Sequence, residues 1–325
     1  MKPVITVVIP TYQRPALLRN CLEALARQHV LAWAQVEIIV VVDGTDFEVF
    51  DLTYRMSKQT GLVIKCLQQK ERRGPAAARN RGWQAASSPF IAFTDDDCLP
   101  QPTWLSAGLL FLLRGGQVLT GQVRMPLPEQ PTHHDQTTAL LETAEFVTAN
   151  LFCRRSALEQ VGGFDEQFDS AWREDSDLQF KFLEAGIPIS TCPEAVIVHP
   201  IRPAPWYASL RDERKNRYDA LLYKRHPDLF RQRIPAYKPL VLRYYVSVIA
   251  LLVGLLAVGV GQPKLALVCL GLWGILTTRL IWERLSGHFG SWQAFKQATL
   301  TSLATPFLSV YWRLYGAFTY KTWFW

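Results

Sequence analysis

The sequence PFIAFTDDDCLP, residues 89–100, joins a short apolar run to three consecutive carboxylates and a Cys-Leu-Pro turn. An apolar run of this length, followed by polar residues, predicts a buried β-strand that ends at the carboxylates. Three adjacent carboxylates repel one another and are costly to remove from water. A chain tolerates such a group when water solvates it, or when a positive charge lies among Asp95, Asp96 and Asp97.

Strand and helix patterns alternate before this run. Short apolar stretches predict three earlier strands, in residues 4–10, 36–44 and 62–69. Amphipathic stretches predict the helices between them, in residues 14–28, 47–61 and 74–87. This alternation predicts an α/β fold, a Rossmann-like and mostly parallel sheet with helices on both faces. Ligands of such sheets bind beyond the carboxyl ends of the strands.

Polar residues stand where these strands end. Thr11 and Tyr12 follow the first strand, Asp43 ends the second, and Asp95 begins the acidic group after the fourth. A carboxylate can accept a hydrogen bond from a base N–H, and an aromatic ring can flank the base. The strand ends together predict a nucleotide site, although polar turns are an alternative explanation for any one of them.

The acidic group has the spacing of a metal site. Side chains alternate along an extended chain, so Asp95 and Asp97 point to the same side. Two hard oxygen ligands suit Mg²⁺ or Mn²⁺ that also binds the phosphates of a substrate. Such an ion would supply the missing positive charge and neutralise a leaving diphosphate.

Composition narrows the class of protein. The 325 residues carry a net charge of +7, which suggests an acidic partner such as a nucleotide, a nucleic acid or an anionic membrane. The six cysteines form no CxxC pair, so we expect neither a zinc ribbon nor a disulfide framework, and a reducing compartment is the simpler interpretation. Basic residues cluster beside the apolar C-terminal runs, which argues against nucleic-acid binding.

The last third of the sequence is apolar. Residues 244–263 carry no charge and are long enough to cross a bilayer, and a second run follows from 265. A single run of this kind could be a buried core helix, but two joined by a Gly-Gln-Pro-Lys turn favour a membrane hairpin of about 240–262 and 265–282. A third apolar segment, about 298–318, could span the membrane, re-enter it or lie at its surface.

Flanking charges predict the orientation of this hairpin. Basic residues lie before the first run and after the second, whereas Lys264 alone lies in the connecting turn. The positive-inside rule then places residues 1–238 in the cytoplasm, and the protein in the cytoplasmic membrane as a multi-pass protein. Residues 206–230 read as a basic amphipathic helix that could meet anionic lipid headgroups, or could simply be a solvated helix.

The sequence resembles the family 2 glycosyltransferases, which have the GT-A fold. The similar stretches run in family order from residue 4 to about 200: VVIPTYQRPALLRNCLEAL, IIVVVDGT, GPAAARNRGW, FTDDDCLPQPTWL, ANLFCRRSALEQVGGFDE and WREDSDLQFKFLEAG. The resemblance implies a GT-A catalytic domain in residues 1–205. The charge and hydropathy patterns add a basic interfacial segment in 206–238 and a membrane region in 239–325.

The resemblance implies roles for individual residues. A UDP- or GDP-sugar would be bound by Pro10, Thr11, Tyr12, Arg14, Asp43, Arg79, Asn80, Asp95 and Asp96. Mn²⁺ or Mg²⁺ would be held by the DxD motif, with Asp97 as direct ligand and with Asp95 and His199. A structural histidine at a strand end is the alternative for His199.

A second acidic motif, WREDSDLQFKF in residues 172–182, is implied to act on the acceptor. The resemblance makes Asp175 the general base, with Glu174 as the second candidate. An acceptor ring could stack on Trp172, although a tryptophan in a loop is more often a packing residue. Acidic residues also favour helix N-termini, which explains Asp177 without any function. We expect the helix N-terminus to lower the pKa of Asp175 and keep it ionised.

One motif of the processive family members is absent. The sequence has no QxxRW element, which favours transfer of one sugar at a time. The resemblance implies an inverting, metal-dependent, hexosyltransferase-type enzyme. The expected membrane topology then favours a membrane-associated, lipid-linked or glycan acceptor in surface polysaccharide synthesis. The alternatives are a polyprenyl-phosphate sugar synthase and a catalytically silent scaffold of the same machinery.

Overall fold

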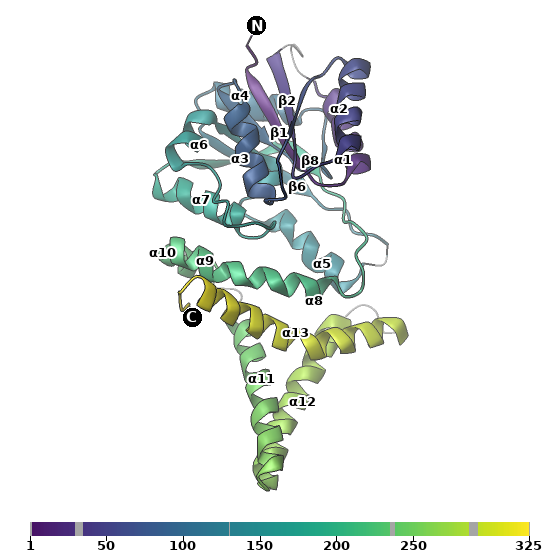
Figure 1. The fold of residues 1–325 in the computed structure, drawn as a ribbon, viewed down its shortest axis with the longest axis vertical. Coiled ribbons are helices and arrows are strands. Elements are labelled where there is room, and N and C mark those ends of the chain that lie inside the picture. Colours follow the sequence, from purple (N-terminus) through teal and green to yellow (C-terminus); the bar gives the residue numbers. More distant parts are fainter. Residues whose placement is uncertain (1, 30–34, 130, 235–237, 286–291, 325) are drawn as a thin grey trace. The chain divides into compact units, whose positions relative to one another are not determined.

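A computed structural model describes residues 2–29, 35–129, 131–234, 238–285 and 292–324 (Figure 1). The chain divides into two compact units. The first unit comprises Met1–Pro131 and Asp135–Arg202, and the second comprises Thr132–His134 and Pro203–Trp325. The sheet and the acidic motifs belong to the first unit, and the long apolar helices belong to the second.

The first unit is built on one eight-stranded sheet with the order β3-β2-β1-β4-β7-β6-β8-β5. The four strands predicted from the sequence are parallel neighbours: β1 (Ile5–Thr11), β2 (Val36–Val42), β3 (Val63–Gln68) and β4 (Phe90–Phe93). The other half is mixed: β5 (Leu99–Pro100), β6 (Val118–Arg124), β7 (Leu151–Arg154) and β8 (Ile189–Val198). β7 pairs antiparallel with both β4 and β6. The predicted α/β fold is confirmed.

Helices cover both faces of this sheet because the strand side chains alternate. Ile5, Val7 and Ile9 of β1 pack with three helices on one face, α1 (Pro15–Ala26), α2 (Phe47–Thr60) and α4 (Trp104–Leu113). Val8 packs with three on the other, α3 (Pro75–Ala85), α6 (Arg155–Val161) and α7 (Glu174–Glu184). The first unit therefore holds its strand ends between two packed layers of helices.

Local sequence explains where the first helices begin and end. α1 and α3 begin with proline, whose fixed φ suits the first helical turn. Asp46 caps α2 by accepting hydrogen bonds from the backbone of Glu48 and Val49. α2 ends at Thr60 and is followed by Gly61, whose φ of 73° is left-handed and suits glycine.

The second unit is helical. Its helices are α8 (Ala208–Asp212), α9 (Arg217–Arg225), α10 (Pro227–Arg233), α11 (Lys238–Gly259), α12 (Pro263–Leu285) and α13 (Trp292–Thr319). A further helix, α5 (His133–Ala139), begins in this unit and continues into the first unit. The basic segment is not one continuous helix, because a 3₁₀ turn, Glu213–Asn216, joins α8 to α9. α9 then ends at Arg225, because the next residue, His226, precedes Pro227. The proline ring disfavours a helical backbone conformation at the residue before it.

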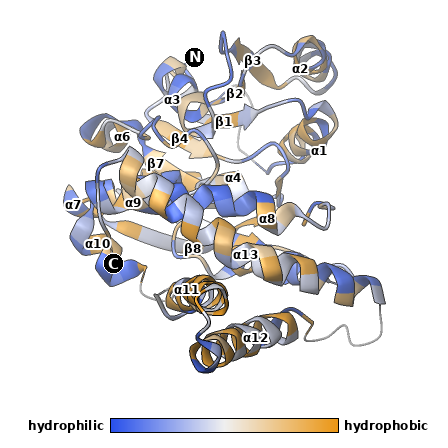
Figure 2. Ribbon diagram, turned by 60° about the horizontal axis from the view of Figure 1, so that its bottom comes forward, coloured by the Kyte–Doolittle hydropathy of each residue, from blue (hydrophilic) through white to orange (hydrophobic). Residues whose placement is uncertain are grey.

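Two helices of this unit are long and apolar enough to cross a membrane, among the residues that the structure describes. They are Pro239–Gly259 and Pro263–Leu285. Figure 2 shows the hydrophobic colour around much of both helices. Only 22% of the most apolar stretch of the first helix and 17% of that of the second are buried, whereas the core helix of a soluble protein is mostly buried. The two helices therefore suggest association with a membrane.

Candidate active site

The candidate site lies where β1, β2 and β4 end. Thr11 is the last residue of β1, Asp43 follows β2, and Asp95 comes two residues after the end of β4. His199 follows β8, and Glu174 begins α7. Residues far apart in the sequence thus meet through the sheet and the first turn of one helix.

Each of the three consecutive carboxylates lies beside at least one arginine. Arg79 Nη2 lies 2.8 Å from Asp95 Oδ1, and Arg202 Nε lies 3.0 Å from Asp97 Oδ2. Asp96 accepts a hydrogen bond of 2.7 Å from Thr11 Oγ1 and lies 3.3 Å from Arg14 Nη1. These arginines explain how the fold tolerates three adjacent acidic side chains, two of which are buried.

The carboxylates differ in their affinity for protons. Burial and the charge of Asp97 raise the pKa of Asp96 to about 6, although Arg14 and Thr11 oppose the shift. Burial would also raise the pKa of Asp95, but the adjacent Arg79 guanidinium outweighs it and holds that pKa below its ordinary value. Asp95 is therefore an ionised, arginine-bound carboxylate.

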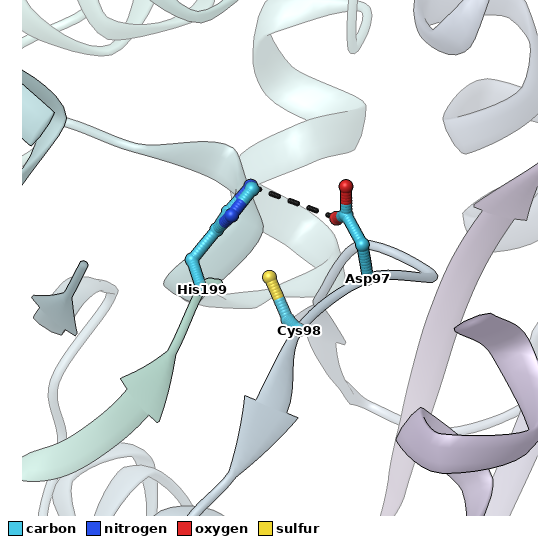
Figure 3. Close-up of side chains that lie close together, drawn as sticks. All are labelled: Asp97, Cys98 and His199. Atoms are coloured by element: carbon cyan, nitrogen blue, oxygen red, sulfur yellow. Dashed lines mark ion pairs between the residues drawn. The ribbon is translucent and has the colours of Figure 1, made fainter. Parts of the chain in front are cut away.

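Asp97, Cys98 and His199 offer one atom each that could bind a metal ion, all within 4.8 Å of one another (Figure 3). His199 Nε2 lies 3.6 Å from Asp97 Oδ1. His199 Nδ1 is buried and has no hydrogen-bond partner within the described part of the chain. Cys98 offers a soft thiol, which suits Mn²⁺ and Mg²⁺ less well than a carboxylate or an imidazole.

The donor set therefore fits a metal in part. A carboxylate with an imidazole suits a first-row transition ion such as Mn²⁺, whereas Mg²⁺ prefers oxygen ligands alone. Arg202 occupies one oxygen of Asp97, so a cation would have to share that carboxylate with the guanidinium or replace it. Asp97 and His199 are the residues that would hold the ion.

Arg79 links the acidic group to the second acidic motif. Its guanidinium is 3% exposed, and Nη1 lies 3.2 Å from Glu174 Oε1 while Nη2 binds Asp95. Burial would lower the pKa of Arg79, but the carboxylates around it, led by Asp95, raise that pKa instead. A permanent positive charge therefore holds the start of α7 beside Asp95.

The two candidate bases have different environments. Glu174 is buried against Arg79, and burial followed by the charge of Asp175 raises its pKa to about 8. Asp175 is only half-buried and accepts two hydrogen bonds from Thr148, 2.6 Å from Oγ1 and 3.2 Å from the backbone N–H. Asp175 is thus the more accessible and the better oriented carboxylate.

The expected lowering of the Asp175 pKa is wrong. Burial raises this pKa, and the opposing effects of Arg79 and Thr148 do not cancel it. The first turn of α7 lies among buried groups, so the cost of removing the carboxylate from water exceeds the stabilisation by the helix dipole.

Asp43 has a structural contact that the sequence did not reveal. Its Oδ1 accepts hydrogen bonds from Gln69 Nε2 at 3.0 Å and from the Arg73 backbone at 2.7 Å, and its Oδ2 accepts one from the Gly74 backbone at 2.9 Å. These bonds fix the loop before α3. The contact of Asp43 with a base stays a prediction.

The replacement Asp43→Asn is expected to lower the free energy of unfolding by about 2 kcal/mol, because charged hydrogen bonds are lost and an amide N–H faces backbone donors. Thermal unfolding of the detergent-solubilised protein would measure this. The control is Asp46→Asn, since asparagine caps a helix about as well as aspartate. Equal Tm values for the two variants would contradict the assigned role of Asp43.

Asn80 also has structural contacts. Its Nδ2 donates to the Phe164 carbonyl and to Glu166 Oε1, and its Oδ1 accepts from Trp83 Nε1 and the Phe164 backbone. These four bonds hold the loop after α6, so a contact with the sugar donor stays a prediction. Pro10 is buried within β1, opposite Val41, and is likewise placed as part of the scaffold.

Two aromatic rings near the site each contact an arginine guanidinium. The Arg72 guanidinium lies 4.3 Å from the ring centroid of Tyr12, and that of Arg173 lies 5.1 Å from the ring of Trp172. An arginine guanidinium therefore lies over the ring of Tyr12 and another over the ring of Trp172, which is the geometry of a cation–π contact. Stacking of a base on Tyr12 and of an acceptor on Trp172 stay predictions.

Sequence reasoning missed three residues of the site. Arg202 binds Asp97, Thr148 orients Asp175, and Arg72 covers Tyr12. Arg202 lies three residues after His199, and this proximity was an available signal. Thr148 had no signal, because it is 27 residues from its partner in the chain.

Comparison with known sequences gives concordant results. The chain matches the profile of Glycosyl transferase family 2 over residues 6–164 and that of Glycosyl transferase family group 2 over residues 132–315. It is 27% identical over 214 residues to glycosyltransferase AglE of Haloferax volcanii, covering 62% of this chain and 68% of that protein. It is 30% identical over 250 residues to the pre-mycofactocin glycosyltransferase of Mycobacterium tuberculosis, covering 69% of this chain and 48% of that protein.

Two further comparisons involve a lipid-linked glycan and a solved structure. The chain is 28% identical over 95 residues to the GalNAc(5)-diNAcBac-PP-undecaprenol beta-1,3-glucosyltransferase of Campylobacter jejuni. This match covers 29% of this chain and 30% of that protein. The mannosyltransferase PcManGT from Pyrobaculum calidifontis, solved with GDP-Man and Mn²⁺, superposes with a TM-score of 0.57 at 17% identity, covering 97% of this chain and 88% of that one. The structural likeness shows a shared fold, and the sequence matches show that the chain belongs to the family 2 glycosyltransferases.

Proposed function

We propose that this glycosyltransferase moves a sugar, with inversion and with the help of Mn²⁺ or Mg²⁺, from a nucleotide-sugar to a membrane-associated acceptor. UDP- and GDP-sugars are the candidate donors. The acceptor hydroxyl would attack the anomeric carbon, and the nucleoside diphosphate would leave from the opposite side. Asp175 would take the hydroxyl proton as the new glycosidic bond forms.

The bridge made by Arg79 carries this proposal. One buried guanidinium contacts Asp95 of the donor motif and Glu174, the neighbour of Asp175. The leaving diphosphate and the acceptor must approach the same carbon from opposite sides, so their binding groups have to lie next to each other. The Arg79 bridge supports this arrangement from residues of the first unit alone.

A divalent ion would bind to Asp97 and His199 in this proposal. Its chemistry is to neutralise the diphosphate as negative charge develops on it. Arg14 and Arg202 already lie near the same carboxylates and would add to that electrostatic stabilisation. The Mn²⁺ in the PcManGT complex supports the choice of ion by analogy.

The membrane acceptor rests on the second unit. Two helices long and apolar enough to cross a bilayer would keep the enzyme at a membrane surface, with the flanking arginines and lysines on its cytoplasmic side. There it would meet a lipid-linked glycan without extracting it. The relative from Campylobacter jejuni, whose name specifies an undecaprenol-linked substrate, supports this acceptor class.

Release of nucleotide tests the proposal. Purified full-length protein in detergent would be offered a panel of nucleotide-sugars with Mn²⁺ or Mg²⁺, with and without a membrane lipid extract. Release that requires both the metal and the extract is expected, and the donor that gives it is thereby identified. An absence of both release and metal-dependent nucleotide binding across the panel would refute the proposal and favour a silent scaffold.

The pH dependence is a separate prediction. Because burial raises the pKa of Asp175 above the ordinary 3.8, the base is protonated and lost at a higher pH than a solvated aspartate would be. At saturating metal, kcat/KM is therefore expected to fall as the pH decreases, with an apparent pKa above 3.8. Substituting Asp175→Glu should move this acidic limb. A limb that stays in place would assign it to another group.

A further inference from the structure

The burial of α13 is the reverse of that of an ordinary surface helix. Its buried side carries small and polar residues, namely Ala298, Thr301, Ser302, Thr305, Ser309, Arg313 and Gly316. Its exposed side carries large apolar and aromatic residues, namely Trp292, Phe295, Leu300, Leu303, Tyr311, Tyr315 and Phe318. A helix in a soluble unit normally buries its apolar side instead.

The polar side is held by specific contacts inside the second unit. Arg313 Nη1 lies 2.9 Å from Asp219 Oδ2 of α9, and Thr305 Oγ1 accepts a hydrogen bond of 2.9 Å from Arg284 of α12. A Cβ added at Gly316 would lie 2.3 Å from the carbonyl oxygen of Arg217, so α13 approaches α9 closely. These contacts fix the rotation of α13 and leave its apolar side facing outward.

The neighbouring helices indicate what covers this side. α11 and α12 of the same unit also expose apolar surface, and they are the helices suited to cross a bilayer. α13 itself is not among the candidate spans, and in Figure 1 it runs across the α11–α12 hairpin, not along it. Its exposed side is rich in Trp, Tyr and Phe, which are favoured where hydrocarbon meets headgroups.

We infer that α13 lies in the plane of the membrane interface, with its apolar side in the lipid and its polar side on the protein. Helices that present a wide apolar side to lipid bind bilayers in this orientation. Lys296, exposed near the start of α13, could extend its ammonium group to the headgroups. The chain would cross the membrane twice, and both ends of α13 would lie on the side where α11 begins. This inference rests on the membrane anchorage in the proposed function.

Photo-crosslinking in lipid vesicles tests whether lipid contacts the exposed apolar side of α13. The full-length protein is reconstituted in vesicles of phosphatidylethanolamine and phosphatidylglycerol, with p-benzoylphenylalanine in place of Leu303 or, separately, Phe318. Position 256 of α11, where Leu256 is 67% exposed, is the positive control, and position 47 of α2, where Phe47 is 80% exposed, is the negative control. Irradiation is expected to add the mass of a lipid at positions 303, 318 and 256 but not at 47.

The side of the C-terminus separates a helix that lies on the membrane from one that spans it. Topology reporters are fused after residue 325 or inserted at residue 262, in the α11–α12 turn. The C-terminal reporter is expected in the cytoplasm and the turn reporter outside. A C-terminal reporter outside would overturn the inference, because α13 would then span.

The remaining outcomes separate this inference from the proposed anchorage. Crosslinks from positions 303 and 318 to a second copy of the chain, with lipid still added at 256, would overturn the inference and leave the anchorage intact. Absence of lipid at 256, with the turn reporter in the cytoplasm, would instead refute the anchorage itself.

Discussion

Replacing Asp175 by asparagine is expected to lower kcat by about 10²- to 10⁴-fold, the range that a general base contributes. Asparagine keeps the size of the side chain and can still accept the hydrogen bond from Thr148 Oγ1, but it cannot take a proton from an acceptor hydroxyl. The loss should therefore fall on turnover and leave the binding of the nucleotide-sugar unchanged.

The measurement combines turnover with the affinity for the donor. Single-turnover rates and the Kd of the nucleotide-sugar would be compared between the wild type, Asp175→Asn and the control Glu184→Gln, at the exposed end of the same helix. The control should retain full activity. Full activity of Asp175→Asn would contradict a base at this position and would favour a polyprenyl-phosphate acceptor, because a phosphate needs no general base.

The replacement Asp97→Asn is expected to reduce kcat/KM at least about a hundredfold, comparable with the removal of one group that stabilises transition-state charge. The neutral amide is a weaker metal ligand than the carboxylate, so the activation by Mn²⁺ should need far higher concentrations of the ion. Arg202 would also lose its partner, and some loss of thermal stability should accompany the change.

Cys98→Ser is the matched comparison for Asp97→Asn. The thiol lies in the same three-residue cluster, but a soft thiol suits Mn²⁺ less well than a carboxylate, so its loss should not change the concentration of Mn²⁺ needed for activity. Both variants would be titrated with Mn²⁺ while nucleotide release is measured. If Cys98→Ser weakened the metal response and Asp97→Asn did not, the assignment of the ligands would be wrong.

The sequence predicted the parallel half of the fold well. The strands β1 to β4 are short apolar runs with polar ends, and the helices between them are the crossovers that parallel strands need. Their order in the sheet, β3-β2-β1-β4, does not follow from these patterns. The position of Asp95 to Asp97 at the end of β4 follows from the same pattern. Local patterns are enough for β1, β2 and β4 because these strands are buried on both faces, whereas β3, at the edge of the sheet, is partly exposed.

The second half of the sheet and the partners in the site could not be predicted this way. β6, β7 and β8 pair in mixed directions, and such pairing depends on contacts between distant parts of the chain. The partnership of Asp175 with Thr148 and the raised pKa of Asp175 depend on burial, which no local pattern reports. The path of α13 was undecided for a similar reason, because its hydrophobicity does not say which side is buried.

The arginine shared by Asp95 and Glu174 has a consequence for the order in which substrates bind. If a bound donor breaks the ion pair between Asp95 and Arg79, the guanidinium keeps Glu174 as its remaining partner. The electrostatic potential at the neighbouring Asp175 then changes. Two sites that share one charge are thermodynamically coupled, and the coupling acts equally in both directions. An acceptor should then alter the Kd of the donor by the same factor by which the donor alters the Kd of the acceptor. Arg79→Lys, with a single ammonium in place of the two-pronged guanidinium, should reduce that factor in a titration of one ligand against the other.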